Sequence, residues 1–78
     1  KGYMGHTMSA CGAIETILSI YMLQEGFTAA TLNLEEVDER CSMIRHSMKL
    51  EESNVKIASI QNFAFGGVNT ILFIKKWE

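Results

Sequence analysis

The first six residues of this 78-residue chain contain two side chains that could do chemistry. Lys1 supplies an amine and His6 an imidazole, and His6 comes just before an apolar segment with helical spacing. The start of a helix presents free N–H groups and the positive end of the helix dipole. A histidine there could donate to a developing oxyanion, and the dipole would help to keep its ring neutral. The alternative is a frayed Lys1 and a loop His6 with a satisfied hydrogen bond.

A second group of this kind lies near the end of the chain, in the segment Phe63-Ala-Phe-Gly-Gly-Val-Asn69. Its adjacent glycines, Gly66 and Gly67, supply the positive φ angles of a tight hairpin turn. Phe63 and Phe65 beside them could form a gate over an apolar tunnel, with backbone N–H groups free to hold an oxyanion. The alternative is an ordinary hairpin whose two phenylalanines belong to the core.

The two cysteines, Cys11 and Cys41, could form at most one disulfide, and no Cys-x-x-Cys or similar spacing indicates a metal site. We therefore expect reduced thiols in a cytoplasmic protein and no bound metal. Cys11 falls in the first helical turn, where thiolates are favoured, but a small buried side chain is the simpler interpretation. Cys41 and His46 lie in a polar connection, where the sequence indicates no partner for either.

One long helix is predicted over residues 9–25, with Ser9 as its N-cap and Gly26 as its C-terminal stop. Apolar residues follow the i, i+3, i+4, i+7 spacing of a helix and extend well beyond one stripe. A helix that is apolar on most sides is normally buried on most sides. The rest of this chain is too short to cover it, so we expect other protein to pack on it.

Strands are predicted over residues 31–34, 55–63 and 68–75, and a short one over 43–45. The second and third should form a hairpin within residues 55–75, with the 31–34 strand in the same sheet. The apolar run from 71 to 74 favours a strand covered on both faces. The predicted fold class is therefore α/β, with one buried helix followed by three or four mostly antiparallel strands.

Composition excludes several classes of function. The net charge is −2 and the basic residues are scattered, which argues against nucleic-acid binding. No apolar run approaches the roughly 18 residues of a membrane-spanning helix. Because hydrophobic gain and ordering entropy nearly cancel at this size, the chain has little stability to spare. It begins with lysine, so we expect that a true N-terminus has been lost.

The ordered set of motifs resembles one family. The chain contains, in this order, Lys-x-x-x-Gly-His, a small-residue helix entry, a Thr-x-Asn-Leu segment and Phe-x-Phe-Gly-Gly-x-Asn. This order resembles that in the C-terminal part of β-ketoacyl-[acyl carrier protein] synthases, which are condensing enzymes of the thiolase superfamily. Residues 23–39 look especially like the chain-elongating synthases of fatty-acid synthesis. The resemblance covers nearly all 78 residues. It implies that residues 1–78 are a C-terminal piece of a thiolase-like αβαβα fold, not a complete domain.

The resemblance also implies roles for individual residues. His6 would donate to the malonyl thioester carbonyl during decarboxylation, and Lys1 would support the site electrostatically. Phe65 would be the gate of the acyl pocket, and its backbone N–H, with the adjoining Gly66, would belong to the oxyanion hole. Phe63 matches the other aromatic residue of the loop and would line the acyl pocket. Neither cysteine matches the family's nucleophile, which lies upstream with a second active-site histidine.

Departures from the family pattern lie beside these residues. Ala64 stands where the family has glycine, which should stiffen the gate. The others are Met4 and Val68 for threonine, Gln61 for asparagine, Ala29-Ala30 for a common proline and Cys11 for alanine.

The expected activity of the intact enzyme is decarboxylative Claisen condensation of an acyl-enzyme with malonyl-[acyl carrier protein]. The 78 residues alone should be inactive. No cofactor of its own is expected, because the substrates travel on the phosphopantetheine arm of acyl carrier protein. The expected partners are the rest of the synthase chain, acyl carrier protein and a second subunit. The alternatives are a polyketide or aryl-polyene synthase and a non-catalytic subunit that sets chain length or binds carrier protein.

Overall fold

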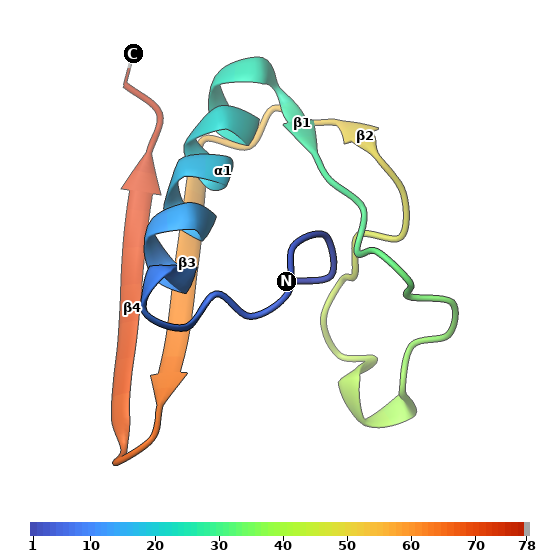
Figure 1. Ribbon diagram of the computed structural model, residues 1–78. Helices are drawn as coiled ribbons and strands as arrows, with labels where there is room; N and C mark the ends of the chain where they lie inside the picture. The colour runs from blue at the N-terminus through green and yellow to red at the C-terminus, as the bar shows by residue number, and fades with distance from the viewer. Residues whose placement is uncertain (78) are drawn as a thin grey trace.

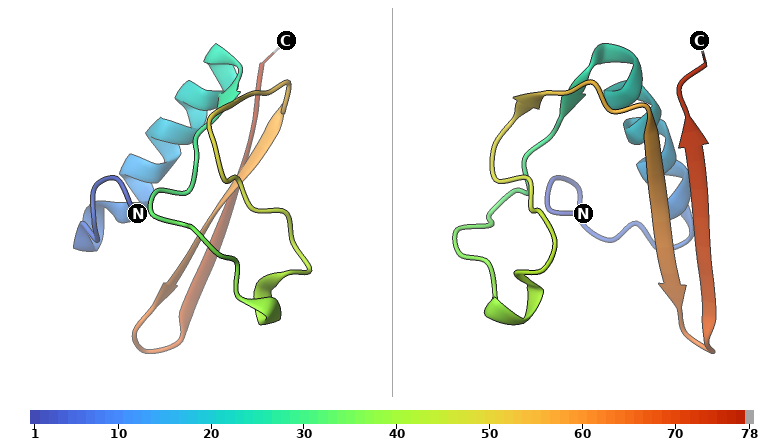
Figure 2. Two further views of the ribbon diagram at one scale, coloured as in Figure 1. Left: turned by 90° about the vertical axis from the view of Figure 1, so that its right-hand side faces the viewer. Right: turned by 180° about the vertical axis from the view of Figure 1, so that it is seen from behind.

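The computed structural model describes residues 1–77 and contains one α-helix and two small antiparallel sheets (Figure 1). The helix, α1 (Cys11–Glu25), lies along the hairpin that ends the described chain. In chain order the strands are β1 (Phe27–Thr28), β2 (Glu51–Glu52), β3 (Ile57–Ala64) and β4 (Val68–Lys75), and two short 3-10 helices span Met8–Ala10 and Glu39–Cys41. The connection from residue 29 to residue 50 loops away from α1 and the hairpin (Figure 2).

The predicted helix is confirmed, but α1 begins at Cys11 and not at residue 9. A 3-10 turn precedes α1, and the N-cap is Ala10, which makes no side-chain cap. The prediction of Ser9 as the N-cap is therefore wrong. The stop at Gly26 is confirmed: its φ is 74° and its N–H donates to the Met22 carbonyl. Glycine adopts this left-handed conformation without the steric penalty that a Cβ brings.

Replacing Gly26 by alanine is expected to lower the free energy of unfolding by about 1–2 kcal/mol, the cost of an L-residue in this conformation. A Cβ there would also lie 3.3 Å from the Ser53 carbonyl oxygen. Gly5→Ala is the matched control, because Gly5 has a φ of 77° and open space where its Cβ would be. Urea unfolding of the intact protein should show a larger loss for Gly26→Ala. Equal losses would mean that the Ser53 contact is relieved at no cost.

The predicted hairpin is confirmed. β3 and β4 pair antiparallel from Ile57 opposite Lys75 to Ala64 opposite Val68. The turn between them contains the two adjacent glycines, both with positive φ (89° and 84°). Alternate residues of β3 face α1, and the buried Ile60 lies on that side. The hairpin therefore carries its turn well beyond the N-terminal end of α1 (Figure 1).

Two of the predicted strands are wrong. Residues 31–34 form a turn in which the Leu34 N–H donates to the Thr31 carbonyl and Asn33 takes a φ of 69°. Alternation over so few residues does not distinguish a strand from a turn, and asparagine tolerates the left-handed conformation. Residues 43–45 also lie outside any strand. The strand in this region is β1, which pairs with β2 in a sheet separate from the hairpin.

Little of the apolar surface is covered by the described residues. The buried apolar side chains are those of Cys11, Leu23 and Ile60. The apolar run of β4, predicted to be covered on both faces, is about half exposed at Ile71 and Leu72. The fold is an α/β fragment, consistent with the C-terminal portion of a thiolase-like fold. No helix among residues 1–77 is both long and apolar enough to cross a membrane.

Candidate active site

An open hollow of about 790 Å³ lies between the start of α1 and the end of the hairpin. It brings together His6, Phe63 and Phe65, which the sequence places at opposite ends of the chain. The other lining residues are Met8, Ser9, Cys11, Gly12, Asn62, Ala64 and Thr70. The two segments singled out for their chemistry therefore meet at one site.

The close approach of α1 to β3 sets the width of this hollow. A Cβ on Gly12 would lie 3.3 Å from the Asn62 amide nitrogen, which is tighter than an ordinary contact. On the neighbouring strand, the Thr70 hydroxyl donates to the Asn62 carbonyl at 3.5 Å. Glycine at position 12 thus lets the first turn of the helix lie directly on the strand that carries Phe63.

His6 is held in one orientation by a hydrogen bond from the backbone. The Met8 N–H donates to His6 Nδ1 at 3.0 Å, so in the neutral ring the proton belongs on Nε2. Met8 takes a φ of 54°, which is uncommon for a residue with a side chain and costs on the order of 1–3 kcal/mol. The ring is exposed and His6 lines the hollow, so Nε2–H is left to donate to a ligand.

Lys1 pairs with a residue of α1 and does not line the hollow. Its Nζ lies 2.9 Å from Glu15 Oε1, and the hydrogen bond to Glu15, followed by the charge of that carboxylate, raises the pKa of Lys1. The N–H groups of Met4 and Gly5 both donate to the Lys1 carbonyl, which folds the lead-in back on itself. Lys1 is therefore anchored and not frayed, but it is not among the residues that line the hollow.

Replacing Glu15 by glutamine is expected to bring the pKa of Lys1 down toward 10.5, because the partner that raises it is gone. Because the pKa of Lys1 is raised in the folded protein, the stability that its pairing contributes is present below pH 10.5 and is lost as the pH rises through the raised pKa. Lys1 therefore stays charged throughout the neutral range. NMR titration of the lysine in the intact protein measures the pKa. Asp38→Asn, which breaks the separate Asp38–Arg40 pair, is the control and should leave it unchanged. A Lys1 pKa unaffected by Glu15→Gln would contradict this assignment.

The tip of the hairpin presents its aromatic rings outward. Phe65 is fully exposed and Phe63 is 74% exposed, so the alternative that both are core residues of this chain is wrong. Gly66 lies in the turn with a φ of 89° and is not among the lining residues. The oxyanion-hole and gating roles of Phe65 and Gly66 stay predictions.

The two cysteines differ in burial, and Cys11 is the small buried side chain that was predicted. Cys11 is 4% exposed and its thiol is free. Its Sγ accepts hydrogen bonds from the Thr7 N–H and hydroxyl and lies 3.6 Å from His6 Nδ1, a contact that the sequence analysis missed. Cys41 is exposed, and its carbonyl oxygen lies 2.8 Å from His46 Nε2, which is the partner that the sequence did not indicate.

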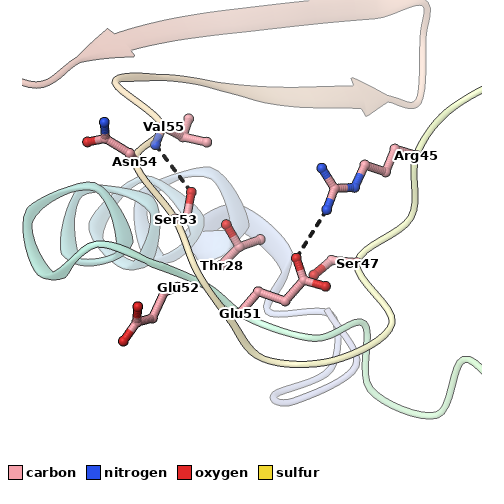
Figure 3. A pocket seen from close by; sticks show the side chains of 8 residues that line it. All are labelled: Thr28, Arg45, Ser47, Glu51, Glu52, Ser53, Asn54 and Val55. Atoms are coloured by element: carbon pink, nitrogen blue, oxygen red, sulfur yellow. Dashed lines mark hydrogen bonds and ion pairs between the residues drawn. The ribbon is translucent and has the colours of Figure 1, made fainter.

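A second hollow, of about 480 Å³, lies beside β1 and β2 (Figure 3). Arg45 and Glu51, which line it, form an ion pair of 3.1 Å, and the Val55 N–H donates to Ser53 Oγ. The other lining residues are Thr28, Ser47, Glu52 and Asn54. None of the predicted site residues lines this hollow. Nowhere in residues 1–77 does a group of histidine, cysteine or acidic side chains suit a metal ion.

Several known proteins are similar in sequence to this chain. Residues 1–35 match the family described as β-ketoacyl synthase, C-terminal domain. Over its full length the chain is 39% identical to a 3-oxoacyl-[acyl-carrier-protein] synthase homolog of Saccharomyces cerevisiae, covering 19% of that protein. Over 97% of its length it is 33% identical to 3-oxoacyl-[acyl-carrier-protein] synthase 1 of Escherichia coli K12, again covering 19%. A putative mitochondrial synthase of Schizosaccharomyces pombe is 36% identical over 99% of this chain, which covers 18% of it.

The chain thus spans about a fifth of the length of the curated relatives it matches. The family match covers the helix and the segment that carries His6, and the relatives extend the similarity through the hairpin. These comparisons show that the chain is similar to one part of 3-oxoacyl-[acyl-carrier-protein] synthases. Its segments around His6 and around Phe63 and Phe65 line one hollow.

Proposed function

We propose that the chain is the C-terminal part of a β-ketoacyl-[acyl carrier protein] synthase that elongates fatty acids by decarboxylative Claisen condensation. The observation that carries this proposal is the fixed His6 ring. Its Nδ1 accepts from the Met8 N–H, and its Nε2–H is left to donate within a hollow bordered by Phe63 and Phe65. That is the arrangement needed to stabilise negative charge on a carbonyl oxygen.

The proposed reaction has two stages in the intact enzyme. First, the thiolate of a cysteine upstream of this chain attacks the acyl thioester, the carbon–sulfur bond to the carrier protein breaks, and the carrier-protein thiolate leaves. Second, malonyl thioester loses CO₂, and the bonding electrons form an enolate whose oxygen accepts from His6 Nε2–H. The enolate carbon attacks the acyl-enzyme carbonyl, the carbon–sulfur bond breaks and the cysteine thiolate is released.

The other residues of this chain have supporting roles in the proposal. Lys1 is paired with Glu15 in this chain, and its proposed electrostatic support of the site comes from the family resemblance. The exposed ring of Phe65 at a glycine turn suits a gate that packs onto an acyl chain, and its backbone N–H would hold the second oxyanion. Phe63 would contact the acyl chain. No cofactor is required, because the thioester carrier supplies the activated carbonyls.

The proposal includes the partners of the intact enzyme. The rest of the synthase chain supplies the nucleophile, and acyl carrier protein delivers both substrates. A homodimer in the cytoplasm is proposed from the family resemblance. Because the nucleophile lies outside this chain, residues 1–78 alone are proposed to be inactive.

Formation of the acyl-enzyme tests the proposal. The intact protein is incubated with acyl-[acyl carrier protein], digested and analysed by mass spectrometry. A thioester on one cysteine, outside residues 1–78, is expected. An intact protein that binds the carrier protein without being acylated would overturn the proposal in favour of a non-catalytic, chain-length-setting or scaffold subunit. Comparing fatty acyl and polyketide starter chains distinguishes elongation in fatty-acid synthesis from the polyketide or aryl-polyene alternative.

A further inference from the structure

The buried thiol of Cys11 touches the imidazole that the proposed reaction uses. Cys11 is the first residue of α1, and its Sγ lies 3.6 Å from His6 Nδ1, within hydrogen-bonding range for sulfur. It is one of the few buried side chains described, at 4% exposed, while His6 beside it is exposed. The contact therefore joins the rigid start of the helix to the side chain that faces the hollow.

The neighbouring donors fix the direction of this hydrogen bond. His6 Nδ1 already accepts from the Met8 N–H, so it carries no proton in the neutral ring, and the thiol can meet it only as a second donor that shares the same lone pair. Cys11 Sγ in turn accepts from the Thr7 N–H at 3.2 Å and from the Thr7 hydroxyl at 3.3 Å. The thiol hydrogen is then directed away from Thr7 and toward His6 Nδ1.

We propose that Cys11 is a positioning residue for His6, whose thiol, aligned by Thr7, donates to Nδ1 and holds the ring with Nε2–H directed at the substrate carbonyl. This inference rests on the proposed function, because it assigns Cys11 a part in orienting the donor of that reaction. Two donors that share the Nδ1 lone pair restrain the rotation of an exposed ring more than one donor does. A histidine that accepts a hydrogen bond on one ring nitrogen keeps its proton on the other.

The test compares Cys11→Ala and Cys11→Ser in the intact synthase. Cys11→Ala removes the donor, and we expect malonyl decarboxylation to slow roughly two- to fivefold, the effect of a hydrogen bond in the weaker half of the usual range. Acylation of the nucleophile should be unchanged. Cys11→Ser keeps a donor, although its shorter C–O bond places the hydroxyl farther from Nδ1 than the thiol, and it should restore part of the rate. Thr7→Val, which removes only the hydroxyl that aligns the thiol, should give a smaller loss.

A readout besides rate separates positioning from packing. In ¹⁵N NMR of labelled enzyme, the His6 Nδ1 resonance of Cys11→Ala should move toward that of a nitrogen with fewer donors, and Cys11→Ser should move it back. Unchanged rate and unchanged Nδ1 resonance in Cys11→Ala would overturn the inference while leaving the proposed function intact. Equal losses in Cys11→Ala and Cys11→Ser without a change at Nδ1 would assign Cys11 to packing and also overturn it. If His6→Ala itself has no effect on decarboxylation, the proposed function fails instead.

Discussion

Replacing His6 by alanine in the intact protein is expected to slow malonyl decarboxylation by about 100- to 1000-fold, the usual cost of losing one oxyanion donor. The reason is that Nε2–H of a neutral His6, fixed by the Met8 N–H on Nδ1, interacts more strongly with the enolate oxygen than with the carbonyl it comes from. The loss should appear in the rate and not in substrate binding. Release of CO₂ from malonyl-[acyl carrier protein] in a single turnover measures it.

Two comparisons make this prediction specific. Acylation of the upstream cysteine should be much less affected in His6→Ala, because the nucleophile and its own oxyanion hole remain. His46→Ala is the matched control: His46 bonds a backbone carbonyl in the polar connection and does not line the hollow, so both steps should proceed at the wild-type rate. Equal losses in acylation and decarboxylation would assign His6 a general structural role. No loss in either would mean that it is an ordinary loop residue.

The isolated 78-residue chain is expected to be poorly stable and to associate through its apolar surface. Cys11, Leu23 and Ile60 are its buried apolar residues among those described, while β4 and much of α1 expose large apolar side chains. Soluble monomers seldom leave contiguous apolar patches of this extent uncovered. Amide exchange with little protection, together with concentration-dependent sedimentation, is the expected result.

A single substitution should act in opposite directions in the two contexts. Phe73 on β4 is 65% exposed here, so Phe73→Lys should reduce association of the isolated chain. In the intact protein, where we expect other chain to cover β4, the same change should destabilise by about 3 kcal/mol or more, as for a large core side chain replaced by a charge. A strongly protected monomer of the isolated chain, or a neutral effect of Phe73→Lys in the intact protein, would contradict the expected cover.

The elements set by local signals could be predicted from the sequence. Gly26 ends α1 because its left-handed conformation suits glycine, and the pair Gly66 and Gly67 sets the turn of the hairpin. The pairing of β1 with β2 could not be predicted, because each strand is two residues long and a long connection separates them. Alternation at residues 31–34 indicated a strand, whereas the positive φ of Asn33 turns the chain there.

For the site, too, local features could be predicted from the sequence, and contacts between distant segments could not. His6, Phe63 and Phe65 were selected by type and spacing, and the hollow that joins them depends on how closely α1 lies on β3 at Gly12, which no local pattern encodes. The contact of Cys11 with His6 depends on the unusual backbone of Met8 and was missed for the same reason. A cysteine five residues after a histidine at a helix start was the signal present in the sequence.

Formation of a condensation product tests the central claim most directly. The intact protein is given an acyl-[acyl carrier protein] and malonyl-[acyl carrier protein], and the products are identified by mass spectrometry with ¹³C-labelled malonyl groups. The account predicts a 3-oxoacyl-[acyl carrier protein] in which the acyl chain is joined to the labelled carbons, with one CO₂ released per product. An intact protein that binds both carrier proteins but forms no 3-oxoacyl product would contradict it.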